Sequence, residues 1–234
     1  MIHIKICGLQ PGDDLSFTRY REITHVGFIL VPASRRYVGP AEISVMAREV
    51  DASCKKVGVY VNDAPATVID SAKMAGLDVV QLHGNEDLQS CRQLKRAGFQ
   101  VWKALSMPVA KYGAETLAAQ MVEYAPFVDA VLLDAAPPKG AQTSVTGGHG
   151  VQFDWARLRA VEDLLQKQSG GVPLPPVWVA GGIRPDNVSS LLQEFTPYGI
   201  DVSSGVEVNQ RKSIHQIEAM REAVKRHVDR ATTG

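Results

Sequence analysis

Short apolar runs alternate with stretches of helical periodicity along the whole chain. In the first run, Ile2, Ile4 and Ile6 alternate with His3, Lys5 and Cys7, which is the two-residue period of a strand. Later runs, such as 25–31, are apolar on both faces, as parallel strands covered by helices are. We predict eight strands, at about 2–7, 25–31, 56–61, 77–82, 99–105, 128–133, 177–180 and 199–202.

A helical segment follows each predicted strand, and several are bounded by a proline at the start and a glycine at the end. Eight strand–helix units with no change in composition predict one (β/α)8 TIM barrel of class α/β over residues 1–234. An open doubly wound sheet is the alternative, but its GxGxxG fingerprint is missing after the first strand. A turn at 10–14 precedes a short predicted helix that ends at about residue 21. The other predicted helices span about 40–51, 64–75, 86–97, 109–124 and 213–230, with two more opening at 153–155 and 185.

The composition is that of an ordinary globular protein with a small-molecule partner. Hydrophobic residues make up 45% of the 234 residues and charged residues 21%. Lys plus Arg and Asp plus Glu both total 25, so no net field would attract nucleic acid or an anionic membrane. We therefore expect neither of those partners.

The cysteines and histidines indicate a cytoplasmic protein without a metal. Cys7, Cys54 and Cys91 form no CxxC pair, and an odd number without a disulfide framework fits a reducing compartment. The first residues lack the apolar run of a signal peptide, and no apolar stretch reaches the roughly 20 residues of a membrane helix. The six histidines include no HExxH. Cys54 and Cys91 fall on predicted helices or their ends, and we expect both to be buried small residues.

The carboxyl ends of the strands are where a barrel places its active site. We interpret Asn62, Asp63 and Lys103 as the polar residues that any strand end presents to water. The other ionisable groups at these ends are candidates for chemistry. They are Cys7, Arg35, Arg36, His83 and Asp134.

Two loops rich in glycine and serine follow the seventh and eighth predicted strands. Loops at these two positions form the common phosphate site of such barrels, because glycine lets backbone N–H groups approach an anion and serine adds hydroxyl donors. The alternative is that the glycines only make tight turns. The predicted phosphate-binding residues are Gly181, Gly182, Ser203, Ser204 and Gly205.

Cys7 and Asp134 end the first and sixth predicted strands, on opposite sides of the barrel mouth. A thiolate is a competent base once nearby positive charge, here Lys5, Arg36 or His83, lowers its pKa from about 8.5. An aspartate is a general acid if burial or a neighbour retains its proton. The alternatives are core packing for Cys7, a loop cap for Asp134 and a structural hydrogen bond for His83.

Eight blocks of sequence together resemble the phosphoribosylanthranilate isomerase family of tryptophan biosynthesis. The resemblance extends from Lys5 to about Lys212, and the set is specific although each block alone is weak. The blocks are KICG at 5–8, GF at 27–28, SRRYV at 34–38, QLHG at 81–84, LLD at 132–134, FDW at 153–155, AGGI at 180–183 with Pro185 and Asn187, and DVSSGVE at 201–207.

The resemblance implies a cofactor-independent Amadori rearrangement of N-(5-phosphoribosyl)anthranilate by a monomer or homodimer. By the same resemblance, Asp134 is the general acid that opens the ribose ring, and Cys7 is the general base that removes a proton from the second ribose carbon. Arg36 matches the residue that holds the anthranilate carboxylate, a bidentate task that suits a guanidinium. His83 and Asp201 are expected to bind or orient the substrate, and the two glycine–serine loops hold its phosphate.

Two departures from the family leave details open. In the loop after the sixth strand, His149 replaces a small hydroxyl residue, and residues 135–146 form a longer segment than usual. The contacts of this loop with substrate therefore remain open. Arg35 stands where the family often has proline or lysine, so Arg35 and Arg36 are alternatives for the carboxylate.

Three rival functions are weighed against this hypothesis. An indoleglycerol-phosphate synthase-like lyase would use a catalytic lysine and glutamate. The isomerase of the histidine pathway would carry aspartate in place of Cys7. A non-catalytic phosphate-binding barrel would have no reason to retain both Cys7 and Asp134.

Overall fold

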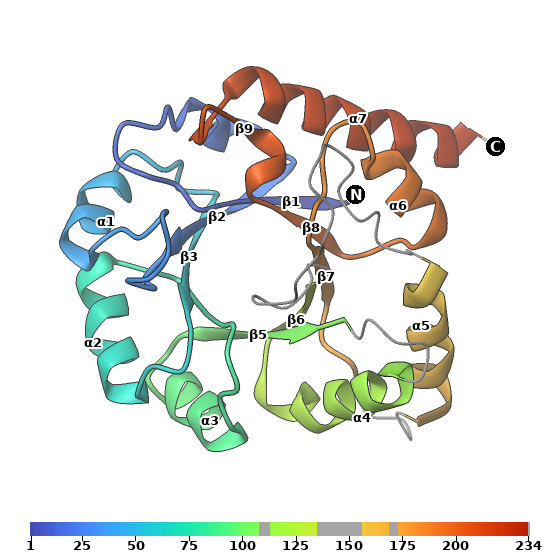
Figure 1. The fold of residues 1–234 in the computed structure, drawn as a ribbon, viewed down its shortest axis with the longest axis horizontal. Coiled ribbons are helices and arrows are strands. Elements are labelled where there is room, and N and C mark those ends of the chain that lie inside the picture. The colour runs from blue at the N-terminus through green and yellow to red at the C-terminus, as the bar shows by residue number, and fades with distance from the viewer. Residues whose placement is uncertain (108–112, 135–155, 169–172, 234) are drawn as a thin grey trace, which may run out of the picture.

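Eight parallel strands close into a barrel in sequence order, with helices in a ring outside it (Figure 1). The computed structural model describes residues 1–107, 113–134, 156–168 and 173–233. The closed ring, from β1 back to β8, confirms the predicted (β/α)8 fold and excludes the open sheet. The strands are β1 (His3–Cys7), β2 (Ile23–Ile29), β3 (Lys55–Tyr60), β4 (Val79–Leu82), β5 (Gln100–Ser106), β6 (Ala130–Asp134), β7 (Val177–Ala180) and β8 (Gly199–Val202).

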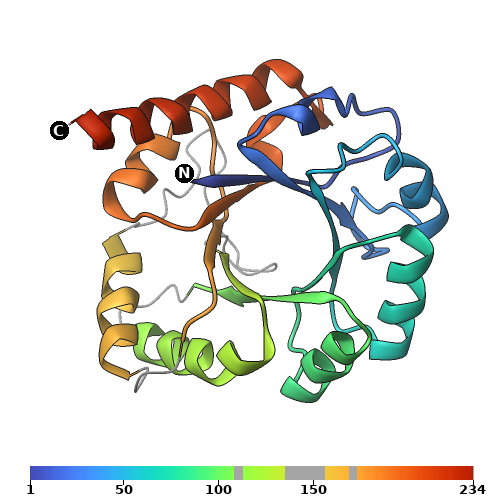
Figure 2. The same ribbon diagram turned by 180° about the vertical axis from the view of Figure 1, so that it is seen from behind.

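The outer ring contains α-helices and short 3-10 helices, with α7 lying on the outside beside α6 (Figures 1 and 2). Its members are η1 (Ser16–Arg19), α1 (Pro40–Met46), α2 (Pro65–Ala75), α3 (Leu88–Arg96), α4 (Ala114–Tyr124), η3 (Ala125–Phe127), α5 (Ala156–Gln168), α6 (Val188–Glu194) and α7 (Ile214–Thr233). A further 3-10 turn, η4 (Ser204–Val206), follows β8 at the mouth of the barrel. Among the described helices none is long and apolar enough to cross a membrane.

The first connection differs from its prediction. Only the single 3-10 turn η1 forms where we predicted a short helix after the turn at 10–14, ending at about residue 21. Gly12 turns the chain at a φ of 85°, and the Asp14 carboxylate accepts the Ser16 N–H, so the helical residues are limited to one turn. The predicted helix start at 153–155 lies outside the described residues.

The strands separate two cores. Ile4 and Ile6 of β1, and Ile2 directly before it, lie in the large core under the helices, as their alternation predicts. The inner core includes Trp102 and Trp178, whose rings each lie 4.9 Å from the His25 ring. Burial lowers the pKa of His25 to about 3, so this histidine is uncharged at neutral pH. The aromatic rings therefore fill the barrel below the level at which Cys7 ends β1.

A small hairpin after β8 was not predicted. Its strands are β9 (Glu207–Val208) and β10 (Arg211–Lys212). The two turn residues, Asn209 and Gln210, have φ angles of 50° and 64°, as in a tight two-residue turn. Glu207 pairs with Lys212 across the hairpin, so both side chains lie at the mouth of the barrel.

Candidate active site

A cavity of about 280 Å³ opens at the carboxyl ends of the strands. Ten of the residues predicted for the site line it, although they come from the ends of six different strands; Arg35, the alternative to Arg36, is not among them. The ten residues are Cys7, Arg36, His83, Asp134, Gly181, Gly182, Asp201, Ser203, Ser204 and Gly205. The fold therefore brings these ten together, and the role of each residue stays a prediction.

Cys7 is the last residue of β1 and is only 6% exposed. Gly27, its partner on β2, leaves the space that the thiol occupies: a Cβ on Gly27 would lie 2.6 Å from Cys7 Sγ and 3.1 Å from Lys5 Cε. Both distances are too short for ordinary packing. Glycine at this position thus lets two interior side chains of β1 lie against the neighbouring strand.

Lys5 is fully buried inside the barrel, one interior position below Cys7. Its Nζ lies 2.8 Å from Asp201 Oδ2 and 2.9 Å from Gln81 Oε1, and Cys7 is among the groups that influence its pKa. Burial alone would lower the pKa of Lys5, but the Asp201 carboxylate, and Cys7 whenever it is a thiolate, outweigh burial and raise that pKa. The interior of the barrel therefore holds a permanent ammonium beside the thiol.

The pKa of Cys7 is raised, so the expectation that nearby cations lower it is wrong for the free protein. Burial is the largest cause, and the Asp201 carboxylate adds to it. Lys5 and Lys212 act in the opposite direction, as predicted for Lys5, yet they do not overcome the loss of solvent. The free protein thus carries Cys7 as a thiol, with a cation in place to stabilise the thiolate.

Asp134 joins the same interior network from the opposite side of the barrel. Its Oδ2 lies 3.0 Å from His83 Nε2, and His83 Nδ1 lies 3.1 Å from Gln81 Nε2. Gln81 accepts from Lys5 in turn. A continuous row of hydrogen bonds therefore connects the candidate acid with the ammonium that influences the pKa of the candidate base.

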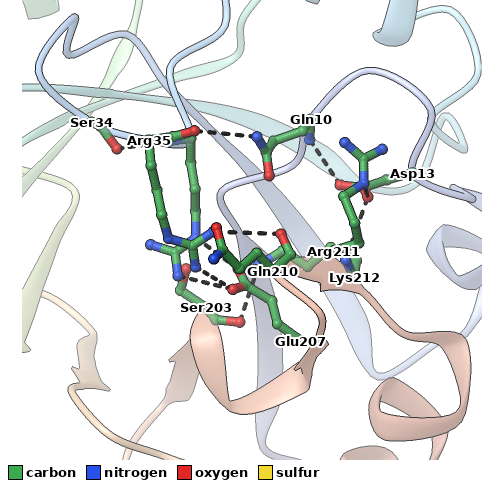
Figure 3. A network of polar contacts seen from close by, with 10 residues as sticks. Gln10, Asp13, Ser34, Arg35, Ser203, Glu207, Gln210, Arg211 and Lys212 are labelled. Atoms are coloured by element: carbon green, nitrogen blue, oxygen red, sulfur yellow. Dashed lines mark hydrogen bonds and ion pairs between the residues drawn. The ribbon is translucent and has the colours of Figure 1, made fainter.

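A second polar cluster lies at the rim, on the hairpin and the loop after β2 (Figure 3). Arg36 donates to both oxygens of Glu207, from Nε at 2.7 Å and from Nη2 at 3.0 Å. Arg35 and Lys212 also bind this carboxylate. Burial would raise the pKa of Glu207, but these three donors lower it to about 2. Three cations thus surround one carboxylate, which leaves an excess of positive charge at the rim.

The structure separates the two arginines. Arg36 lines the cavity, and its side chain is 17% exposed. The Arg35 side chain is 40% exposed and is not one of the described residues that line the cavity. Arg36 is therefore the arginine placed to contact a ligand there.

The loops after β7 and β8 meet at one side of the cavity. Gly181 and Gly182 have φ angles of 97° and 65°, a region that favours glycine. A Cβ on Gly205 would lie 1.8 Å from the Ile183 carbonyl oxygen, so the two loops touch through backbone. Ser203 and Asp201 line the cavity, and each has one buried side-chain oxygen, Ser203 Oγ and Asp201 Oδ1, without a hydrogen-bond partner among the described residues. A hydrogen bond with a ligand would satisfy either oxygen.

Comparison with known proteins identifies the family. The model of the N-(5'-phosphoribosyl)anthranilate (PRA) isomerase family matches residues 4–223. The chain belongs to this family. The isomerase of Bacillus licheniformis is 34% identical over 227 residues, which cover 96% of each chain. The isomerase of Rhodopseudomonas palustris strain HaA2 is 37% identical over 206 residues, which cover 87% of this chain and 86% of the relative.

Solved structures agree with this assignment. The PRA isomerase of Thermotoga maritima superposes with a TM-score of 0.77 at 29% identity, over 96% of this chain and 99% of that one. Another solved PRA isomerase is a complex with reduced 1-(o-carboxyphenylamino)-1-deoxyribulose 5-phosphate, with a TM-score of 0.75, 28% identity and the same coverage. The chain is thus a PRA isomerase by family, and the lyase and the non-catalytic barrel are set aside.

Several residues of this PRA isomerase site were missed or left without a role. Gln81 stands two residues before His83 on β4, so strand alternation was the signal that its side chain faces the interior. Glu207 and Lys212 gave no signal, since their hairpin is too short for a periodic pattern. Lys103, interpreted as a solvated strand end, is instead buried outside the barrel with Glu86, 2.9 Å from its carboxylate. His149 and the glycine cluster at 147–150 lie outside the described residues.

Proposed function

We propose that this PRA isomerase converts N-(5-phosphoribosyl)anthranilate to the carboxyphenylamino-deoxyribulose phosphate with Asp134 as general acid and Cys7 as general base. One observation carries the proposal: the two groups line the same cavity from β6 and β1, beside the paired glycine–serine loops. An acid and a base at separate points of one bound sugar suit an isomerisation that only moves protons.

In the first step Asp134 gives its carboxyl proton to the ribose ring oxygen. The bond between that oxygen and the first ribose carbon breaks, and the nitrogen lone pair forms a C=N bond to the same carbon. The products are an open-chain protonated Schiff base and the Asp134 carboxylate. The positive charge of the Schiff base then lies in the cavity that contains the Cys7 thiol.

In the second step the Cys7 thiol first loses its own proton to solvent, and the resulting thiolate removes the proton from the second ribose carbon. The C–H electron pair becomes a double bond between the first two carbons, and the C=N pair returns to nitrogen, which gives a neutral enolamine. Tautomerisation of the enol to the ketone completes the reaction, with no net gain or loss of electrons. A proton from solvent then restores the Asp134 carboxyl group, so that the protons balance over one turnover. The raised pKa of Cys7 makes the thiolate a strong base, and the Lys5 ammonium stabilises it as it forms.

Three contacts orient the substrate in this proposal. Glu207 occupies Nε and Nη2 of Arg36, which leaves Nη1 for the anthranilate carboxylate. The loops after β7 and β8 hold the phosphate, with Ser203 Oγ as a donor that has no other partner among the described residues. The unpartnered Oδ1 of Asp201 accepts from a ribose hydroxyl. His83 contributes through its hydrogen bond to Asp134.

We place the reaction in the cytoplasm, in a monomer or homodimer that needs no cofactor. Three free, buried thiols accord with a reducing compartment. The Thermotoga maritima relative is described as a dimer from which monomers have been generated. The proton transfers above use only groups of the chain, the substrate and solvent.

The decisive assay follows the loss of anthranilate-type fluorescence when freshly made phosphoribosylanthranilate is added without metal or nucleotide. We expect turnover by the wild type and rescue of a tryptophan auxotroph. Asp134→Asn should lower kcat by about 10²- to 10⁴-fold, the usual contribution of a general acid. Asp129→Asn, directly before the start of the same strand, is the matched control and should retain kcat. Absence of turnover and of rescue, or an Asp134→Asn variant as fast as the control, would contradict the proposal.

A further inference from the structure

We propose that Gln81 is a positioning residue that fixes the tautomer of His83, so that a one-way chain of hydrogen bonds runs from Lys5 through Gln81 and His83 to Asp134. The inference rests on the proposed role of Asp134 as general acid. It assigns a function to the buried side-chain amide of Gln81, whose hydrogen-bond partners are Lys5 and His83 and not the proposed acid or base.

The direction of the chain follows from its first member. A lysine ammonium can only donate, so the Gln81 atom 2.9 Å from Lys5 Nζ must be the amide oxygen. The amide nitrogen of Gln81 therefore faces His83 Nδ1, at 3.1 Å, and can only donate to it. His83 Nδ1 must be the unprotonated, accepting nitrogen of the ring.

The protonation of the second ring nitrogen of His83, Nε2, follows from that of Nδ1. A neutral imidazole with an accepting Nδ1 carries its proton on Nε2. That proton is donated to Asp134 Oδ2, 3.0 Å away. The carboxyl proton that Asp134 transfers to substrate accordingly belongs on Oδ1, since Oδ2 accepts from His83.

The alternative arrangements are each penalised by Lys5. A proton on His83 Nδ1 would face the N–H of Gln81, and rotation of the amide would turn its NH₂ toward the Lys5 ammonium. Lys5 cannot relieve either clash by moving, because it is fully buried and held by Asp201 at 2.8 Å. Lys5 is held in place by Asp201 on β8, and the row of hydrogen bonds that starts at Lys5 ends at Asp134 on β6.

The chemical consequence concerns the fate of the Asp134 proton. Because His83 Nε2 already carries a proton, the imidazole cannot take the one that Asp134 must give to the ribose oxygen. As the carboxylate forms, its Oδ2 keeps a hydrogen bond from a neutral donor that is itself polarised by Gln81 and Lys5. The chain therefore directs the proton to substrate and stabilises the anion left behind.

The direct test is the nitrogen NMR spectrum of the full-length protein labelled with ¹⁵N-histidine, with the His83 signals assigned by their loss in His83→Asn. We expect the Nε2–H tautomer for His83 in the free enzyme at neutral pH. An Nδ1–H tautomer or an imidazolium would overturn the inference. This measurement needs no turnover, so it is separable from failure of the proposed reaction, which the fluorescence assay reports.

Two variants at position 81 sharpen the test. Gln81→Met removes the donor with little change in size, and Gln81→Glu supplies an acceptor that favours a proton on His83 Nδ1. We expect both to shift the His83 tautomer and to lower kcat about tenfold or more, as for loss of a hydrogen bond to a charged group, with KM little changed. Unchanged tautomer and kcat in folded Gln81→Met would refute the role of Gln81.

Discussion

Two polar networks lie at the mouth of the barrel, and they differ in how their donors and acceptors are arranged. The interior network runs through Lys5, Gln81, His83 and Asp134, and each link is a single hydrogen bond. The rim network gathers Arg35, Arg36 and Lys212 around Glu207, with several donors on one acceptor. The interior network fixes where each proton lies, whereas the rim provides a surplus of positive charge.

The difference matches what each region has to do. Proton transfer depends on which atom carries the hydrogen, and a row of single hydrogen bonds that starts at a buried ammonium allows one arrangement. Binding a substrate with two anionic groups, a phosphate and a carboxylate, depends on net charge and permits some freedom of position, which the partly exposed rim arginines retain. The two networks should therefore respond differently to the loss of one member.

The largest expected effect on stability is at Lys5. Lys5→Met leaves the buried Asp201 carboxylate without its cation, which costs about 3–5 kcal/mol when one partner of a buried pair is removed. Arg35→Met, in an exposed rim pair, should cost about 1 kcal/mol or less. Urea unfolding of both variants gives the comparison, and addition of Asp201→Asn to Lys5→Met should recover part of the loss. An equal loss in the free energy of unfolding for Lys5→Met and Arg35→Met would contradict the difference between the interior and rim networks.

The next effect separates the two arginines by kinetics. Arg36→Met should raise KM about 10- to 100-fold with kcat within a few-fold of wild type, because a charge-assisted contact made equally in the ground and transition states is lost. Arg35→Met is the matched control and should change KM by less than about threefold. Steady-state fluorescence assays measure both. A larger rise in KM for Arg35→Met would transfer the carboxylate role to Arg35.

A smaller effect concerns the ionisation of Cys7. Burial raises the pKa of Cys7, and Lys5 opposes this rise without cancelling it. The pH at which half of the Cys7 thiols are ionised should therefore lie above the usual thiol pKa of about 8.5. Lys5→Met should move the midpoint to still higher pH. The measurement is the ultraviolet difference between wild type and Cys7→Ser during a pH titration. Cys54 and Cys91, with pKa values of about 12 and 11, cancel in that difference. A midpoint below the usual value would show that the cations dominate.

The sequence was sufficient where periodicity and strand order carry the information. Alternation in β1 placed Cys7 inside the barrel, and the ends of eight strands located ten of the predicted site residues around one cavity. Cys54 and Cys91 are buried, as predicted. These features follow from local patterns and from the closure of the barrel.

The sequence did not reveal the features that depend on which side chains meet across the barrel. The net pKa of Cys7 depends on the balance of burial, Lys5 and Asp201, and two of these groups lie far apart in sequence. The pairing of Arg36 with Glu207 joins residues 171 positions apart. Gln81 acquires its role only from its two neighbours, since an isolated glutamine has no preferred direction of donation.

The central claim is that Cys7 removes the proton from the second ribose carbon. The most direct measurement is kcat for Cys7→Ala beside Cys54→Ala, a buried thiol outside the cavity, with binding of a reduced product analogue measured for both. We predict that Cys7→Ala lowers kcat by about 10²- to 10⁴-fold and leaves analogue affinity nearly unchanged, while Cys54→Ala keeps its kcat. A Cys7→Ala enzyme with kcat near that of Cys54→Ala would contradict the claim and leave Cys7 as a packing residue.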